Sequence, residues 1–206
     1  MSSSKLVRWS GLAALAGGVL FIIVTVAEFL VVGNQPLSEA AVTGAWPAVQ
    51  GGYVVAAVLI GLGLVGLYAR QVQQAGTLGL VAFVVTFVGV LLATGSAWSE
   101  AFLGPWLAST APELLDSGSP AEAAAFLSYM LFSLGWFLFG LASLRARVLS
   151  RGAAILLLIG APLPIVLGFL NVPLGGTVFG VALAWMGYEL WSGAAHEPAL
   201  LAQTAA

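Results

Sequence analysis

Residues 53–70 read YVVAAVLIGLGLVGLYAR, a continuous apolar run that ends in an arginine. Within it, Gly61, Gly63 and Gly66 have the G-x-G-x-x-G spacing of a dinucleotide-binding loop. Such a loop has to follow a strand, begin a helix and precede, by about 20 residues, an acidic residue that binds the ribose. The three glycines instead lie inside the apolar run, and no Asp or Glu occurs from position 40 to position 99. The stretch is therefore interpreted as a membrane-spanning helix, and no nucleotide cofactor is expected.

The composition of the whole chain supports a lipid environment. Of 206 residues, 61% are hydrophobic and 7% are charged, whereas soluble domains carry about a quarter charged residues. Six Lys and Arg residues and a net charge of −2 are too little positive charge to bind nucleic acid. The chain has no cysteine and a single histidine, His196 in the tail, which excludes thiolate metal sites and bis-histidine haem. We expect lipid as the main partner, with no nucleic acid, no metal and no cofactor.

Six apolar runs are long enough to cross a membrane, which takes about 20 residues each. Because the runs are continuous rather than alternating, they predict helices and not barrel strands. The first run is too long for the apolar part of a signal peptide. The predicted fold class is thus an all-α, polytopic transmembrane helix bundle, a single domain over residues 1–206 with a polar C-terminal tail at 193–206. The predicted spans are approximately 9–32, 49–69, 78–103, 121–144, 152–170 and 172–191.

The distribution of basic residues predicts the orientation, because short cytoplasmic loops are enriched in Lys and Arg. The side opposite to the basic residues carries acidic residues only, and we expect it to be the outer side. Trp46, Tyr53, Trp98 and Trp106 are predicted at the outer membrane boundary, as an aromatic belt. Both termini should then be cytoplasmic, in a multi-pass protein of the inner (plasma) membrane. All the basic residues fall on the cytoplasmic side: Lys5, Arg8, Arg70, Arg145, Arg147 and Arg151.

Small residues recur on one face of several predicted helices. Steps of three, four or seven residues place Gly52, Ala56, Gly63 and Gly66 on a common face, and similar faces occur at residues 89–97 and 176–184. Small residues let membrane helices approach one another closely. These faces predict close packing, either within the bundle or against a membrane-protein partner or a second copy of the chain.

Two acidic residues lie within predicted spans, where charged groups are costly and often functional. The helical phase puts Glu28 on one face with Thr25, and Glu100 on one face with Ser96, both in the outer half. If the two carboxylates meet, repulsion between their like charges would favour a bound proton or cation. The alternative is that each carboxylate lies near its helix end and reaches interfacial water.

The fifth predicted span contains Pro162 and Pro164 near its centre. Each proline lacks a backbone N–H, so the carbonyls of Leu158 and Gly160 lose their usual helical partners. Such breaks bind ions in some transporters. They are also tolerated as simple kinks where neighbouring groups replace the lost hydrogen bonds, and we favour this second interpretation.

The fourth predicted span begins with the capping signal Ser119, Pro120 and Glu122. Further along it, Tyr129, Ser133 and Trp136 share a face. Trp136 lies far from either membrane boundary, and its indole N–H is expected to find a partner within the bundle. We interpret it as a packed core residue, the alternative being the wall of a small cavity.

Two stretches, RWSGLAALAGGVLFIIVTVAEFL at 8–30 and LGWFLFGLASLRARVLSRGAAILLLIGA at 134–161, resemble a family of uncharacterised bacterial six-helix integral membrane proteins, classed as a domain of unknown function. An acidic residue near the end of the first helix and an arginine-rich turn before the fifth are features of that family. Glu28 and the turn with Arg145, Arg147 and Arg151 match them. The resemblance implies a bacterial membrane protein and carries no activity.

No nucleophile–base pair or metal cluster is visible, so we do not expect an enzyme. The molecular activity is unknown from the sequence. Our main interpretation is a non-catalytic membrane component that packs through its Gly and Ala faces. The alternative is a small-solute or ion transporter or channel that uses Glu28 and Glu100, with the break at Pro162 and Pro164 as its flexible element.

Overall fold

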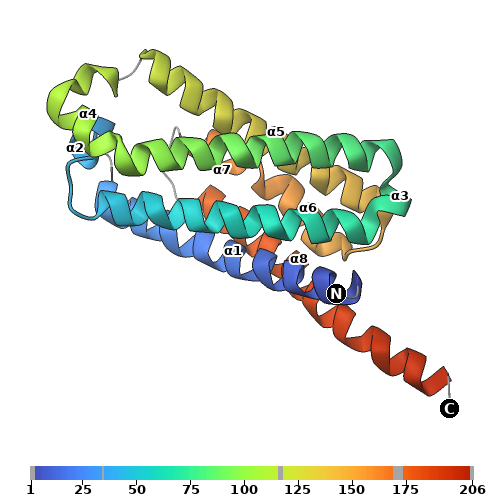
Figure 1. The fold of residues 1–206 in the computed structure, drawn as a ribbon. Coiled ribbons are helices and arrows are strands. Elements are labelled where there is room, and N and C mark those ends of the chain that lie inside the picture. Colours follow the sequence, from blue (N-terminus) through green and yellow to red (C-terminus); the bar gives the residue numbers. More distant parts are fainter. Residues whose placement is uncertain (1–2, 34, 116–117, 169–173, 205–206) are drawn as a thin grey trace.

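The computed structural model describes residues 3–33, 35–115, 118–168 and 174–204, which form helices and turns without any β-strand. Four long helices form most of the bundle, and α6 and α7 lie between α5 and α8 (Figure 1). Two short helices and a 3-10 turn gather at one end. Three helices, α1, α3 and α5, are each long and apolar enough to cross a membrane. The helices in chain order are α1 (Ser3–Val32), α2 (Leu37–Ala40), α3 (Trp46–Phe102), α4 (Gly104–Thr110), η1 (Pro112–Leu114), α5 (Pro120–Ala146), α6 (Arg151–Gly160), α7 (Leu163–Gly168) and α8 (Leu174–Thr204).

Helix α3 is bent back on itself at Gly76. Its 57 residues would extend over about 85 Å if straight, almost three times the hydrocarbon thickness of a bilayer. Gly76 has φ 55° and ψ −149°, a conformation that is accessible almost only to glycine. Two antiparallel limbs result, 46–75 and 77–102, which contact through the stacked rings of Tyr68 and Phe83 (Figure 1). The segment 70–77, predicted as a connection between two spans, is therefore helical except at this glycine.

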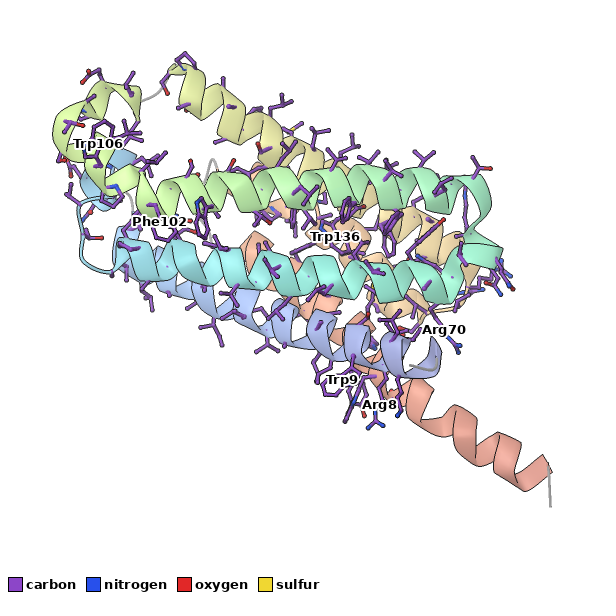
Figure 2. The ribbon with its side chains drawn as sticks, viewed as in Figure 1. Arg8, Trp9, Arg70, Phe102, Trp106 and Trp136 are labelled. Carbon is purple, nitrogen blue, oxygen red and sulfur yellow. The ribbon has the colours of Figure 1, made fainter. Side chains whose placement is uncertain are left out.

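The basic residues gather at one end of the bundle, which we call the basic end. Arg8 and Arg70 lie there, whereas Phe102 and Trp106 lie at the opposite end (Figure 2). Helix α5 runs antiparallel to the second limb of α3, because Gly89 lies against Phe132 and Gly135 lies against Thr86. The C-terminal end of α5, with Arg145 and Arg147, consequently lies beside the bend of α3, and Arg151 follows as the first residue of α6. Helix α5 ends in a left-handed cap at Arg147, whose φ is 56°.

The small-residue faces are used within this chain. Gly63 lies so close to Ala14 of α1 that an added Cβ would come within 2.6 Å of its side chain, and Gly66 lies against Ser10. Gly180 of α8 lies against the backbone of Gly18 in the same way. These contacts join α1 to α3 and α8, as the small-residue pattern predicts. They also confirm that the G-x-G-x-x-G motif is a helix-packing face, because the helix continues through it without a preceding strand.

Trp136 lies at the centre of an aromatic core. Its side chain is fully buried, and its ring makes edge-to-face contacts with Phe139 and Phe179. The indole N–H has no hydrogen-bond partner among the described residues, so the expectation of an internal partner is wrong. The interpretation of Trp136 as a packed core residue agrees with this arrangement.

The break at the two prolines is a kink that α5 bridges. Helix α6 ends at Gly160, and α7 begins at Leu163. The amide of Ile165 donates to the carbonyl of Pro162 at 3.1 Å, so the carbonyl of Ala161 lacks its helical donor. The hydroxyl of Ser133 on α5 donates to that carbonyl at 2.9 Å. Helix α5 therefore satisfies the carbonyl of Ala161, which the prediction based on the two prolines did not include.

The predicted helix cap at Ser119 is present. Helix α5 begins at Pro120, where the hydroxyl of Ser119 accepts a hydrogen bond from the amide of Glu122 at 3.0 Å.

The tryptophans predicted in the outer aromatic belt differ in exposure. Trp98 and Trp106 are exposed. Trp46, predicted in the same aromatic belt, is 2% exposed and packs with Ala40 and Ala41. The prediction for Trp46 is wrong because α2 and α4 cover this end of the bundle.

Candidate functional site

Glu28 is held by a tyrosine from the neighbouring helix. The hydroxyl of Tyr53, at the start of α3, donates to Oε2 of Glu28 at 2.7 Å, and it lies 3.2 Å from Oγ1 of Thr25. Thr25 is buried and Glu28 is half-buried. The ring of Tyr53 packs edge-on against Phe21, with ring centroids 5.4 Å apart. Tyr53 is thus fixed on both its apolar and its polar side.

Glu100 is held in a similar way near the end of α3. The hydroxyl of Tyr129 on α5 donates to Oε1 of Glu100 at 3.2 Å. The indole N–H of Trp46 donates to the backbone carbonyl of Glu100 at 2.9 Å. This second bond ties the beginning of α3 to its end. Glu100 is half-buried, and Tyr129 is 38% exposed, so this part of the site is the more open one.

Four residues at this end of the bundle make up what we call the carboxyl site: Glu28, Tyr53, Glu100 and Tyr129. The two halves of the site lie at the same end, because Trp46, which binds the carbonyl of Glu100, begins the helix whose Tyr53 binds Glu28. Among the residues that the structure describes, no hydrogen bond joins the two carboxyl groups directly. The site combines α1, both limbs of α3 and α5, so residues far apart in the sequence contribute to it.

The carboxyl site has no basic partner in the part of the chain that the structure describes. Lys5 and Arg8 stand at the start of α1, Arg70 before the bend of α3, and the other arginines at the end of α5 and the start of α6, all at the basic end, whereas Glu28 and Glu100 are half-buried near the opposite end. Two neighbouring carboxylates with restricted access to water repel each other, and a proton or a cation between them relieves the repulsion. Within the described residues, no group of three His, Cys, Asp or Glu residues is placed to hold a metal ion.

The remaining candidate residues lie around the site or away from it. Ser96 is half-buried one turn before Glu100. Gly176, in the first turn of α8, packs directly against Thr25. Pro162, Pro164 and Trp136 belong to the kink and the core described above. Ser133 bridges the kink, and of this group only Tyr129 reaches a carboxyl group.

Tyr53 is a site residue that the sequence pattern did not indicate as one. It is predicted in the outer aromatic belt, and its hydroxyl in addition binds Glu28. A signal for this existed: Tyr53 precedes Ala56, Ile60 and Gly63 by three, seven and ten residues, and this helical phase defines the buried face of the first limb. An aromatic residue on that face points into the bundle rather than toward lipid.

Comparisons with protein-family models, with curated proteins and with solved structures gave no match. The resemblance to a bacterial membrane family therefore stays an expectation from two stretches of sequence.

Proposed function

We propose that this protein is a six-span membrane protein that binds a proton or a small cation at the carboxyl site and moves it across the bilayer. The proposal treats α1, the two limbs of α3, α5, the pair α6 and α7, and α8 as the six spans. The basic end and both termini then lie in the cytoplasm, and the carboxyl site lies in the outer half of the membrane.

The lengths and charges of the helical rods support the span assignment. The limbs of α3 have 30 and 26 residues, counted from the bounds of α3 and its bend, and about 20 are enough to cross the hydrocarbon layer. Because α3 is one continuous element with a bend, it provides two crossings. The gathering of every Lys and Arg at one end follows the charge bias of cytoplasmic loops. Exposed Trp9 and Trp106 at the two ends suit the two membrane boundaries.

One observation carries the functional part: Glu28 and Glu100 share a site with two tyrosine hydroxyls and no basic residue. Each hydroxyl donates to one carboxyl oxygen, so it fixes the carboxyl group while the remaining oxygen lone pairs stay available. Oxygen donors of this type bind protons and hard cations. An arginine or lysine in the site would neutralise the pair permanently, and none is present at this end.

The test is ion binding and flux with purified protein in liposomes. Matched vesicles contain the wild type or the double variant Glu28→Gln, Glu100→Gln, and proton and Na⁺ flux are followed with internal fluorescent dyes. Glutamine keeps the shape and removes the charge, so we expect the flux to fall by about 10- to 100-fold, as expected for losing charged interactions of about 1.5–3 kcal/mol. The control Glu113→Gln removes an exposed carboxylate of η1 and should leave the flux unchanged. Wild-type flux in the double variant, or no flux in the wild type, would contradict the proposal.

The packing component remains the second candidate, and the close contacts of the glycine faces bear on it. Those faces meet α1, α5 and α8 of the same chain, so a partner would have to bind the lipid-facing surface instead. An absence of flux together with a stable partner after purification from native membranes would favour this second function.

A further inference from the structure

A second polar region lies deep in the bundle near the basic end. Gln71, on the first limb of α3, is 0% exposed, and neither its amide nitrogen nor its amide oxygen has a hydrogen-bond partner among the described residues. A buried amide without partners is strongly unfavourable, because it loses its hydrogen bonds with water and gains none. A glutamine follows Ile60, Leu64 and Leu67 in the buried helical phase, at a position suited to an apolar side chain.

Ser143 on α5 has the same property. Its side chain is 0% exposed and its hydroxyl is unpartnered within the described residues. Other hydroxyls of the bundle bond to the carbonyl four residues earlier: Thr86 to Ala82, and Ser128 to Ala124. Ser143 does not make this local bond, so its hydroxyl is left free for another group.

The helix register places Gln71 and Ser143 at the same depth. Gly89 lies against Phe132, and Gly135 lies against Thr86, so the antiparallel register puts Ser143 opposite residue 78, just after the bend of α3. Gln71 lies five residues before the bend. Both residues are therefore within the last two turns before the basic end, on two rods that each pack against the second limb of α3.

We propose that Gln71 and Ser143 together bind ordered water in the interior of the basic end. Water fits both groups, since it can accept from the amide nitrogen and donate to the amide or hydroxyl oxygen. No Lys, Arg, Asp or Glu is fully buried among the described residues, so the neutral donor and acceptor groups favour a neutral ligand. If the proposed ion transport holds, this water site forms the cytoplasmic part of the ion pathway, and the carboxyl site forms its outer part.

A double-mutant cycle tests the shared water through thermal unfolding in nanodiscs. Gln71→Leu and Ser143→Ala each remove one partner of the water. If the two groups share it, each single change lowers the Tm by roughly 2–8 °C, and the double change costs clearly less than the sum. If the two groups are simply unsatisfied, each change raises the Tm, which would overturn the proposal. Additive losses would assign the groups to separate partners and would also overturn it.

Two controls keep the result interpretable. Ser128→Ala removes a hydroxyl from the same helix that is already satisfied locally, and it should change the Tm by less than Ser143→Ala does. Gln71→Met replaces Gln71→Leu if the leucine variant does not fold. The double-mutant cycle measures stability alone. A negative result would therefore overturn the shared water without contradicting the proposed ion binding at the carboxyl site. For the transport role, the double variant should slow ion flux while ion binding at Glu28 and Glu100 is retained; unchanged flux would remove the water site from the route.

Discussion

The two polar regions of this bundle differ in how their polar groups are satisfied. At the carboxyl site the charged groups are half-buried, and each accepts a hydrogen bond from a tyrosine. Near the basic end, Gln71 and Ser143 are neutral, fully buried and without a hydrogen-bond partner among the described residues. The charged groups thus keep partial access to solvent, whereas the neutral groups have none. This distribution follows the cost of burial, which is far higher for a charge than for an amide or a hydroxyl.

The close contact between Gly63 of α3 and Ala14 of α1 lies between the two polar regions. Breaking it should cause the largest loss of stability. Gly63→Val adds a branched side chain where even a Cβ would lie 2.7 Å from the Cα of Ala14. We expect a loss of about 3 kcal/mol in the free energy of unfolding, because α1 must move away from α3. Chemical unfolding in detergent, followed by circular dichroism, measures this loss. The control Gly95→Ala has open space around the new Cβ and should be neutral or stabilising; equal losses in both variants would contradict the packing argument.

The carboxyl site is itself asymmetric, and the two tyrosines should differ in effect. Tyr53→Phe removes the 2.7 Å bond to half-buried Glu28, whereas Tyr129→Phe removes a longer, 3.2 Å bond in the more open part. We expect cation affinity to change about tenfold for Tyr53→Phe, since a hydrogen bond to a charged group contributes about 1.5 kcal/mol. Tyr129→Phe should give a smaller change. Isothermal titration with each variant tests the order, and a larger effect at Tyr129 would reverse the roles assigned to the two sides.

The smallest expected loss of stability is at the kink. There, one substitution turns a hydrogen-bonded carbonyl into an unpaired one. Ser133→Ala removes the hydroxyl that bonds to the carbonyl of Ala161, so that a buried acceptor loses its partner. We expect a loss of about 1 kcal/mol in unfolding free energy. Ser128→Ala removes a local bond only and serves as the reference in the same unfolding assay. Equal losses of unfolding free energy in the two variants would mean that the carbonyl of Ala161 has another donor.

The sequence predicts the helices of this fold well, and its contacts less well. Continuous apolar runs and the cap at Ser119 locate the main rods, because helix formation depends on local chemistry. The polar segment 70–77 indicates a connecting loop, although Gln73, Gln74 and Ala75 favour helix up to Gly76. Trp46 was misplaced because α2 and α4, which bury it, are short and carry no strong signal.

The carboxyl site shows the same limit. Glu28 and Glu100 stand out in the sequence, because acidic residues are rare in apolar runs. Their pairing with Tyr53 and Tyr129 depends on which helices are neighbours, and helical phase alone does not provide this. Gln71 and Ser143 also share the buried phase of their helices, but only the packed structure shows that no polar group in the described part of the chain bonds to them.

The bend at Gly76 has a consequence for biosynthesis. The two limbs of α3 bury their facing surfaces against each other through residues close in the chain: Tyr68 with Phe83, and Gly61 with Val90. Such local contacts form early, since closing a short loop costs little entropy. We expect α3 to assemble as a helical hairpin while later segments are still being translated, and to offer α1 and α5 a finished surface on which to dock.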